Sequence, residues 1–138
     1  MNILFLCVGN SARSQIAEGL AKEMLGSEHN IKSAGSIPTG KVHPGAIKTM
    51  KDIGIDISNH SSKSIDDLDK DFMNNLDYVI TLCGEEVCPV VNSKAKIMHW
   101  VNEDPANRTY NERQSEVIFK KTREDIYKLL KNFLILNT

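Results

Sequence analysis

The chain opens on a short apolar run, Ile3 to Leu6, that ends at Cys7 and is followed by a polar, glycine-containing segment and a helix-patterned stretch beginning near Arg13. A strand, a loop and a helix in this order are the opening unit of an α/β fold. The loop directs several backbone N–H groups and the positive end of the helix toward one spot. We expect that spot to hold a tetrahedral oxyanion.

The residue types in this segment fit nucleophilic chemistry on such an anion. A helix N-terminus, converging amides and a nearby guanidinium favour the thiolate form of a cysteine, so Cys7 is the candidate nucleophile. Arg13 presents a planar fork that can grip two oxygens, and Ser14 can donate its hydroxyl to the sulfur. A buried strand-end cysteine before an ordinary helix cap is the alternative interpretation. The expected oxyanion-binding positions are Val8, Gly9, Asn10, Ser11, Ala12 and Arg13.

Composition narrows the setting of this site. With 138 residues, 41% apolar content and a net charge of −1, the chain is expected to form one domain, residues 1–138. That charge predicts neither nucleic-acid nor membrane binding. The apolar start has the length of one strand and lacks a basic leader, so we expect a cytoplasmic protein. We also expect it to be a monomer. Three cysteines, an odd number, argue for reduced or reactive thiols rather than a disulfide framework.

Strands and helices alternate along the chain. Strands are predicted at 3–6, 30–34, 77–82 and 96–100, and helices at about 13–25, at 44–53 and from about 111 onward, with a weak helical stretch at 65–72. Pro44 suits the first turn of the second helix, Ile53 belongs to its apolar pattern, and Gly54 ends it. This pattern predicts an α/β fold with a four-stranded parallel sheet covered by helices on both faces, where ligands bind beyond the carboxyl ends of strands.

A second cysteine cluster, Cys83 and Cys88, follows the third predicted strand. Thiols at one sheet edge can pass oxidation from a substrate to Cys7, then to Cys83 and then to Cys88. If residues 84–88 are helical in the reduced protein, their rise of ~1.5 Å per residue keeps the two cysteines farther apart than a disulfide spans, so the segment has to unwind or loop out for the bond to form. The alternative is a buried strand terminus and an incidental helix residue.

An acid is also needed to protonate a leaving oxygen. Asp104, which precedes Pro105 after the fourth strand, is the candidate, and Glu103 competes with it. A turn-forming aspartate is the common use of such a pair.

These residues resemble the thioredoxin-coupled arsenate reductases, whose fold is that of low-molecular-weight protein tyrosine phosphatases, a three-layer sandwich. The resemblance rests on the Cys7–Gln15 segment and on the following motifs: Ala17-Glu18-Gly19, Ser33-Ala34-Gly35, Ile55-Asp56-Ile57-Ser58, Val79-Ile80-Thr81-Leu82-Cys83, Cys88-Pro89, His99-Trp100 and Asp104-Pro105-Ala106. It implies that Cys7 attacks arsenate, that Cys83 attacks the adduct to release arsenite, and that Cys88 resolves Cys83 as a disulfide which thioredoxin reduces. It also implies an oxyanion ligand, a thiol activator and a general acid at Arg13, Ser14 and Asp104, and a role in arsenic resistance.

No tightly bound cofactor or metal is expected, with one qualification that concerns potassium. Some members of that family bind potassium beside the loop through residues that match Asn10, Glu18, Ser33 and an aspartate, but Lys63 stands at the aspartate's position. We hypothesise that the Lys63 ammonium replaces the ion, pairs with Glu18 and supports Asn10. A solvated lysine in a polar loop is the alternative, and the sequence leaves both open.

Two other classes of function remain. Arsenate, phosphate and sulfate share shape and charge, so Cys7, Arg13 and Asp104 also fit a phosphomonoesterase or tyrosine phosphatase. Two features argue against a phosphatase: the redox thiols, and the lack of an aromatic pair at Ala106 and Asn107. A non-enzymatic arsenite or thiol sensor needs only the cysteines. The electron donor is left open between thioredoxin and a small thiol with glutaredoxin.

Overall fold

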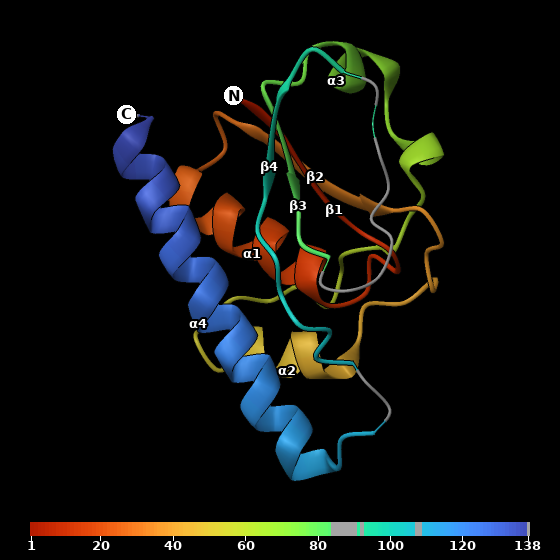
Figure 1. The fold of residues 1–138 in the computed structure, drawn as a ribbon, viewed down its shortest axis with the longest axis vertical. Coiled ribbons are helices and arrows are strands. Elements are labelled where there is room, and N and C mark those ends of the chain that lie inside the picture. The colour runs from red at the N-terminus through yellow and green to blue at the C-terminus, as the bar shows by residue number, and fades with distance from the viewer. Residues whose placement is uncertain (84–90, 92, 107–108, 138) are drawn as a thin grey trace.

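The computed structural model describes residues 1–83, 91, 93–106 and 109–137. The described elements are, in chain order, β1 (Asn2–Cys7), α1 (Arg13–Leu25), β2 (Asn30–Gly35), α2 (Pro44–Lys51), the 3-10 helix η1 (Ile65–Asp67), α3 (Lys70–Asn74), β3 (Tyr78–Thr81), β4 (Lys96–His99) and α4 (Glu112–Leu136). The strands form one parallel sheet in the order β2-β1-β3-β4. The prediction of a four-stranded parallel sheet is confirmed, and Figure 1 shows helices packed along it.

Strand β1 alternates between two hydrophobic cores because successive side chains of a strand point to opposite faces. Ile3 and Phe5 face the larger core, which is built with α1, α2 and α4. Leu4 and Leu6 face the smaller core, which includes Leu68 beside η1 and Phe72 of α3. In Figure 1, α4 runs alongside α1 and α2, while α3 lies on the other side of the sheet. Both faces are therefore covered, as the nearly continuous apolar pattern of β1 predicts.

Helix α2 ends in a turn that corrects one detail of the sequence prediction. Gly54 N–H donates to Lys51 O (2.9 Å) and Ile55 N–H donates to Met50 O (3.0 Å), and Gly54 has a φ of 79°. These bonds form a Schellman turn, which requires left-handed backbone at Gly54. Ile53 was expected on the buried face of the helix, but it lies in this turn and is 45% exposed.

Helix α4 begins where expected, with Asn111 as its N-cap: Asn111 Oδ1 accepts from Gln114 N–H at 2.8 Å. Its buried positions, which include Phe119, Ile126 and Phe133, pack into the larger core. Within the part of the chain that the structure describes, no helix combines the length and the apolar character needed to cross a bilayer.

The strand order places the start of the oxyanion loop at the middle of the sheet. β1 lies between β2 and β3, so the chain leaves β1 at the point where the strand order reverses. Ligands of open α/β sheets bind at such a switch point. The register pairs Cys7 with Gly35 and Leu6 with Thr81, so that the end of β1 meets both neighbouring strand ends.

Candidate active site

The loop after β1 is held by hydrogen bonds on its outer side. Three of its carbonyls accept from the segment that follows β2: Val8 from Ile37 N–H (3.0 Å), Gly9 from Thr39 N–H (3.0 Å) and Ser11 from His43 N–H (2.9 Å). In a trans peptide the carbonyl and the next N–H point in opposite directions. The N–H groups of residues 9, 10 and 12 therefore point away from that segment, which is compatible with the predicted oxyanion cradle.

Two backbone positions make the loop possible. Asn10 adopts a φ of 45°, the left-handed conformation that asparagine tolerates better than most residues. Gly35 packs directly beneath the loop, where an added Cβ would lie 2.3 Å from Val8 O and 2.9 Å from Asn10 N. The loop needs a glycine at the end of β2 because its own backbone fills the space of a side chain.

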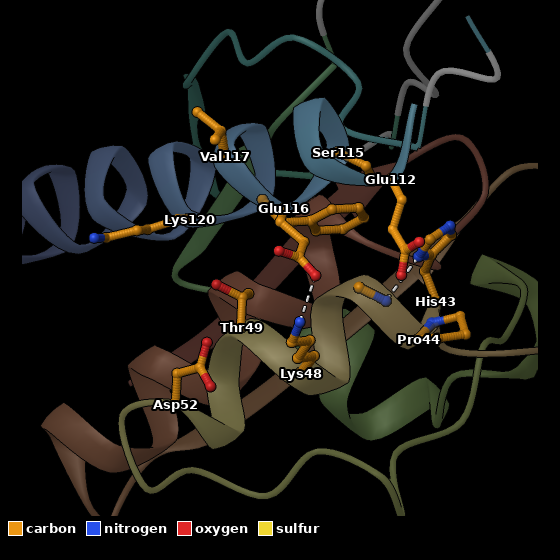
Figure 2. Close-up of a pocket in the computed structure, with 12 residues that line it drawn as sticks. His43, Pro44, Lys48, Thr49, Asp52, Glu112, Ser115, Glu116, Val117 and Lys120 are labelled. Carbon is orange, nitrogen blue, oxygen red and sulfur yellow. Dashed lines mark hydrogen bonds and ion pairs between the residues drawn. The ribbon is translucent and has the colours of Figure 1, made fainter. Parts of the chain in front are cut away.

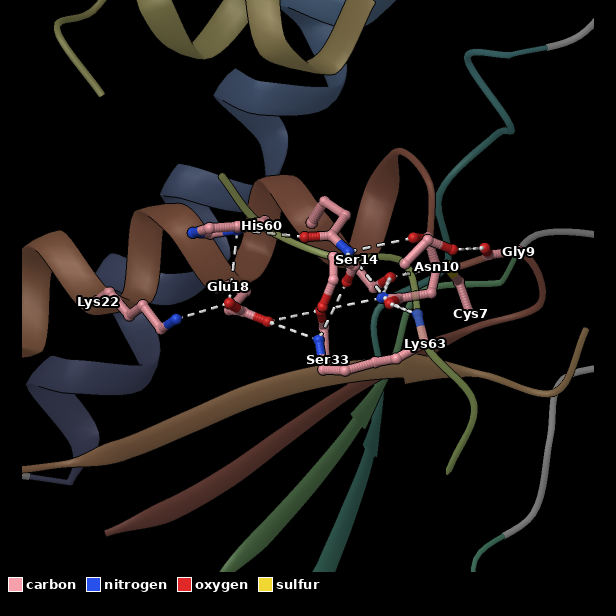
Figure 3. A network of polar contacts seen from close by, with 12 residues as sticks. Cys7, Gly9, Asn10, Ser14, Glu18, Lys22, Ser33, His60 and Lys63 are labelled. Atoms are coloured by element: carbon pink, nitrogen blue, oxygen red, sulfur yellow. Dashed lines mark hydrogen bonds and ion pairs between the residues drawn. The ribbon is translucent and has the colours of Figure 1, made fainter. Parts of the chain in front are cut away.

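Cys7 is a free, buried cysteine whose sulfur contacts Ser14, at the start of α1. The Sγ–Oγ distance is 2.9 Å, and Asn10 Nδ2–H donates to the same Ser14 Oγ at 2.8 Å (Figure 3). A thiolate carries no proton, so in that state the Ser14 hydroxyl must be the donor. The geometry fits the predicted role of Ser14 as the group that stabilises the thiolate.

Arg13 is buried and joins three segments. Its Nη1 donates to Asn102 O at 3.0 Å and to Leu82 O at 3.3 Å, and the side chain also lines the cavity above Cys7. The sequence predicted contact between Arg13 and the oxyanion; the structure adds that Nη1 ties the end of β3 to the loop after β4.

An open cavity of about 580 Å³ brings Cys7, Arg13 and Asp104 together. Asp104 comes from the loop after β4, as expected, and its Oδ1 also accepts from Ala106 N–H at 2.9 Å. The turn that the sequence offered as an alternative is thus present, and the carboxyl group still borders the cavity. Glu103, the competing acid, instead accepts a hydrogen bond from the Tyr110 hydroxyl.

Cys83 lies buried at the carboxyl end of β3, one residue after the carbonyl that Arg13 binds. In the structure Cys83 is disulfide-bonded. Cys88, the helix expected at residues 84–88 and Asn107 lie outside the described residues.

A buried polar network supports the loop (Figure 3). Asn10 Nδ2 donates to Ser33 Oγ (2.9 Å), and Ser33 Oγ donates to Glu18 Oε1 (2.6 Å). Burial opposes the ionisation of Glu18, but hydrogen bonds from Lys22 and Ser33 and the charge of Lys63 outweigh it and lower the pKa of Glu18. The network therefore holds an ionised carboxylate.

Lys63 lies on this network. Its Nζ is 3.7 Å from Glu18 Oε1, and its backbone N–H donates to Asn10 Oδ1 at 2.9 Å. Burial lowers the pKa of Lys63, while Glu18 opposes this shift. The four residues predicted to support the loop, Asn10, Glu18, Ser33 and Lys63, are therefore in one cluster. Among the described residues, no group of three or more His, Cys, Asp or Glu side chains is arranged to hold a metal.

The sequence prediction missed two members of the network. Gln15 Nε2 donates to Asn10 Oδ1 (3.1 Å) and to Ser61 O (2.9 Å). His60 Nδ1 lies 3.2 Å from Gln15 Oε1 and 3.4 Å from Glu18 Oε2. Burial lowers the pKa of His60, against the charge of Glu18. Gln15 carried a signal in the sequence, because it lies in the first turn of α1, directly after the loop. His60 carried none, because it stands in a polar stretch without periodicity.

The chain is similar to known proteins over nearly its full length. The model of the family described as low molecular weight phosphotyrosine protein phosphatase matches residues 2–137. An arsenate reductase of Bacillus subtilis is 45% identical over 133 residues, which cover 95% of this chain and 93% of that protein.

Solved structures give the same picture. A structure described as an arsenate reductase in the phosphate binding state aligns with a TM-score of 0.77 at 31% identity, over 99% of this chain and 98% of that one. A thioredoxin-dependent arsenate reductase of Corynebacterium glutamicum aligns with a TM-score of 0.69 at 30% identity, over 96% of this chain and 61% of that one.

Proposed function

The chain belongs to the low molecular weight phosphotyrosine protein phosphatase family, and we propose that within this family it is an arsenate reductase, which converts arsenate to arsenite. The observation that carries the proposal is the free Cys7 thiol, 2.9 Å from the Ser14 hydroxyl, in a cavity that Arg13 and Asp104 also line. The relatives that are named arsenate reductases support arsenate as the substrate.

The first step is nucleophilic. The Cys7 thiolate attacks arsenic, an S–As bond forms, and an As–O bond breaks. Asp104 gives its proton to the leaving oxygen, which departs as water. The loop N–H groups and Arg13 hold the remaining oxygens, and Ser14 donates to the sulfur before the attack. Arsenic is still As(V) at this stage.

The second step is the reduction. The Cys83 thiolate attacks the Cys7 sulfur, an S–S bond forms, and the electron pair of the S–As bond leaves with arsenic as arsenite. Cys88 then attacks Cys83, which frees Cys7 and gives a Cys83–Cys88 disulfide. The hydrogen bond from Arg13 Nη1 to Leu82 O supports this relay, because it anchors the strand end that carries Cys83 to the site of Cys7.

We assign thioredoxin as the donor that reduces the disulfide, in line with the dependence stated for the Corynebacterium glutamicum relative. A relay of three thiols must be kept reduced between turnovers, which supports a cytoplasmic location.

The alternative activity is hydrolysis of phosphomonoesters, the reaction of the phosphatases that give the family its name. The described walls of the cavity carry Thr39, Lys41 and Ala106 but no Phe, Tyr or Trp side chain that could border an aryl phosphate. This lining favours a small inorganic oxyanion.

A coupled assay tests the function. We expect arsenate-dependent oxidation of NADPH in the presence of thioredoxin and its reductase, and loss of multiple turnover in Cys7→Ser, Cys83→Ser and Cys88→Ser. Cys7→Ser should also lose single turnover, whereas Cys88→Ser should still release one arsenite per protein. Sustained turnover without Cys83 or Cys88 would rule out the relay. Fast hydrolysis of aryl phosphate without arsenate reduction would favour the phosphatase.

Lys63 is proposed to take the place of a potassium ion beside Glu18. Its ammonium is 3.7 Å from Glu18 Oε1, on the same network as the Asn10 side chain. Wild-type turnover should therefore not depend on potassium, and Lys63→Ala should lose about tenfold in turnover and recover part of it at high potassium. Lys32→Ala is the matched control, because Lys32 borders the same surface pocket but lies over the Phe72 ring. Strong potassium activation of the wild type would contradict the proposal.

A further inference from the structure

His43 separates two hollows of the molecular surface. On one side it lines the cavity that contains Cys7 and Asp104. On the other side it lines a groove of about 490 Å³ between α2 and α4 (Figure 2). Its backbone N–H donates to Ser11 O at 2.9 Å, so the residue starts directly beside the oxyanion loop. The proposed reaction does not yet use this side chain.

The hydrogen bonds of His43 define its tautomer. Nδ1 accepts from Gly45 N–H at 2.9 Å, which makes His43 the N-cap of α2 (Figure 2). A nitrogen that accepts carries no proton, so the neutral ring has its proton on Nε2. Ser, Thr, Asp and Asn are the usual residues at this position, because a short side chain with an oxygen caps a helix well. A histidine at this position differs from a carboxylate or hydroxyl cap. Its ring also carries an N–H donor, and that donor lies farther from the backbone than the polar atoms of those shorter side chains.

The ring is fixed by packing. It stacks on Phe119 of α4 with ring centroids 4.9 Å apart and planes 29° apart. Gly45 allows this approach, because an added Cβ there would lie 2.5 Å from the Phe119 ring. The imidazole is therefore held by a cap on one edge and by an aromatic ring on one face, and it does not need to be ordered again when a ligand binds.

The charged groups around His43 come from both hollows. Cys7, Arg13, Lys41 and Asp104 share the cavity with it. In the groove, α2 contributes Lys48, the residue that caps its end is Asp52, and α4 contributes Glu112, Glu116 and Lys120, with Lys48 and Glu116 paired at 2.5 Å. Burial lowers the pKa of His43, and the charge of Asp104 opposes this shift. At neutral pH the ring is thus an uncharged donor beside an anion site. In mildly acidic solution it can gain a positive charge, and the proton on Nδ1 then replaces the hydrogen bond that Nδ1 accepts from Gly45 N–H.

We propose that His43 is an oxyanion-binding residue of the Cys7 cavity, which donates its Nε2–H to the bound tetrahedral anion and holds that anion more tightly once the ring is protonated. The inference deepens the proposed function and rests on the same site.

Sulfate is the probe for the test, because its charge of −2 does not change between pH 5.5 and 8. Its affinity is measured by titration calorimetry in full-length Cys7→Ser, where no site thiol titrates, and in Cys7→Ser/His43→Asn, where the asparagine keeps an N-cap oxygen. We expect His43→Asn to weaken sulfate binding about fivefold at pH 7, the value of one ordinary hydrogen bond. Toward pH 5.5, binding should tighten only in the protein that retains His43.

His29→Asn in the Cys7→Ser background is the matched control, because His29 lies at the amino end of β2 and bonds to the chain terminus at 2.7 Å. It should leave the affinity and its pH dependence unchanged. Equal sulfate affinity and equal pH dependence with and without His43 would overturn the inference.

A second measurement does not rely on a substitution at His43. Binding and protonation are linked, so an anion that binds the imidazolium better must raise the pKa of that ring by the same factor. The NMR titration of His43 in Cys7→Ser should move to higher pH when sulfate is added, and no movement at saturating sulfate would overturn the inference. Because neither measurement involves turnover, His43-dependent sulfate binding in a protein without arsenate reduction would support this inference while contradicting the proposed function.

Discussion

Asn10 joins the loop to its support through a single side chain. Its Nδ2 donates to Ser14 Oγ and Ser33 Oγ, and its Oδ1 accepts from the side chain of Gln15 and the backbone of Lys63. Few residues combine two donors, a strong acceptor and tolerance of the left-handed backbone found here. The position of the Ser14 hydroxyl beside Cys7 thus depends on the buried side-chain amide of Asn10.

Asp104 and Glu103 are neighbours in sequence whose roles the structure separates. Asp104 borders the cavity, whereas Glu103 is engaged with the Tyr110 hydroxyl. We expect Asp104→Asn to lower kcat for arsenate about 100-fold with little change in KM, because proton donation acts in the transition state.

Glu103→Gln is the paired control and should stay within about threefold of wild type, since glutamine can still accept from Tyr110. Steady-state kinetics decide between the two carboxyl groups. A larger loss in Glu103→Gln than in Asp104→Asn would exchange their roles.

Among the elements, β2 and the segment after it shape the loop although they contain none of the residues proposed to react. The N–H groups of Ile37, Thr39 and His43 bind the outer carbonyls of the loop, and Gly35 packs beneath its backbone. The direction in which the loop amides point is therefore set by a neighbouring strand as much as by the loop itself.

Gly35→Ala tests this dependence. The added Cβ would meet backbone atoms at 2.3 and 2.9 Å, and backbone cannot rotate away as a side chain can. We expect iodoacetamide to alkylate Cys7 at least tenfold more slowly at pH 7, as the amides and Ser14 move from the sulfur.

The control for that variant is Gly26→Ala, which places alanine at a φ of 78° at the end of α1 with no atom within 4 Å of the new Cβ. It should lower the free energy of unfolding by about 1 kcal/mol through backbone strain and leave the alkylation rate unchanged. Equal alkylation rates in the two variants would mean that Gly35 does not position the loop.

At the scale of the whole molecule, two cores enclose the sheet and the polar network is buried between α1, β2 and the loop before η1. Burial of His43 and His60 lowers the pKa of each below its ordinary value of 6.5. The unfolded chain therefore binds more protons than the folded one in mildly acidic solution, and stability must rise with pH in that range.

We expect the urea midpoint of unfolding to fall progressively as pH decreases from 7.5 to 5, because both rings take up a proton less readily in the fold than in the unfolded chain. The lowered pKa of Glu18 adds a further loss only below about pH 4.5, where its unfolded form takes up a proton. Denaturation of wild type and His60→Gln at several pH values measures this, and the variant should show a shallower dependence between pH 7.5 and 5. A midpoint that is constant over that range, or that rises on acidification, would contradict the burial argument.

The sequence by itself determined the elements and the residues at the strand ends. The apolar run of β1, the N-cap Asn111 and the turn at Gly54 are local signals, which can be read without knowing what each element packs against. The same logic placed Cys7, Cys83 and Asp104 at one edge of a parallel sheet, because a parallel sheet brings its carboxyl ends together. The prediction that Ile53 lies on the buried face of its helix was wrong, because an apolar pattern at helical spacing does not show where the last turn of the helix leaves the core.

Only the tertiary structure decided which polar side chains meet. The contacts of Arg13 with Leu82 and Asn102, of His60 with Gln15 and Glu18, and of His43 with Phe119 join segments that are distant in sequence. No periodicity encodes such contacts, because they depend on how strands and helices pack and on small spaces such as the one left by Gly45. The residues that carry the chemistry of the loop, Cys7, Arg13 and Ser14, are thus recognisable from the local sequence. The residues that orient them are brought together only by the fold.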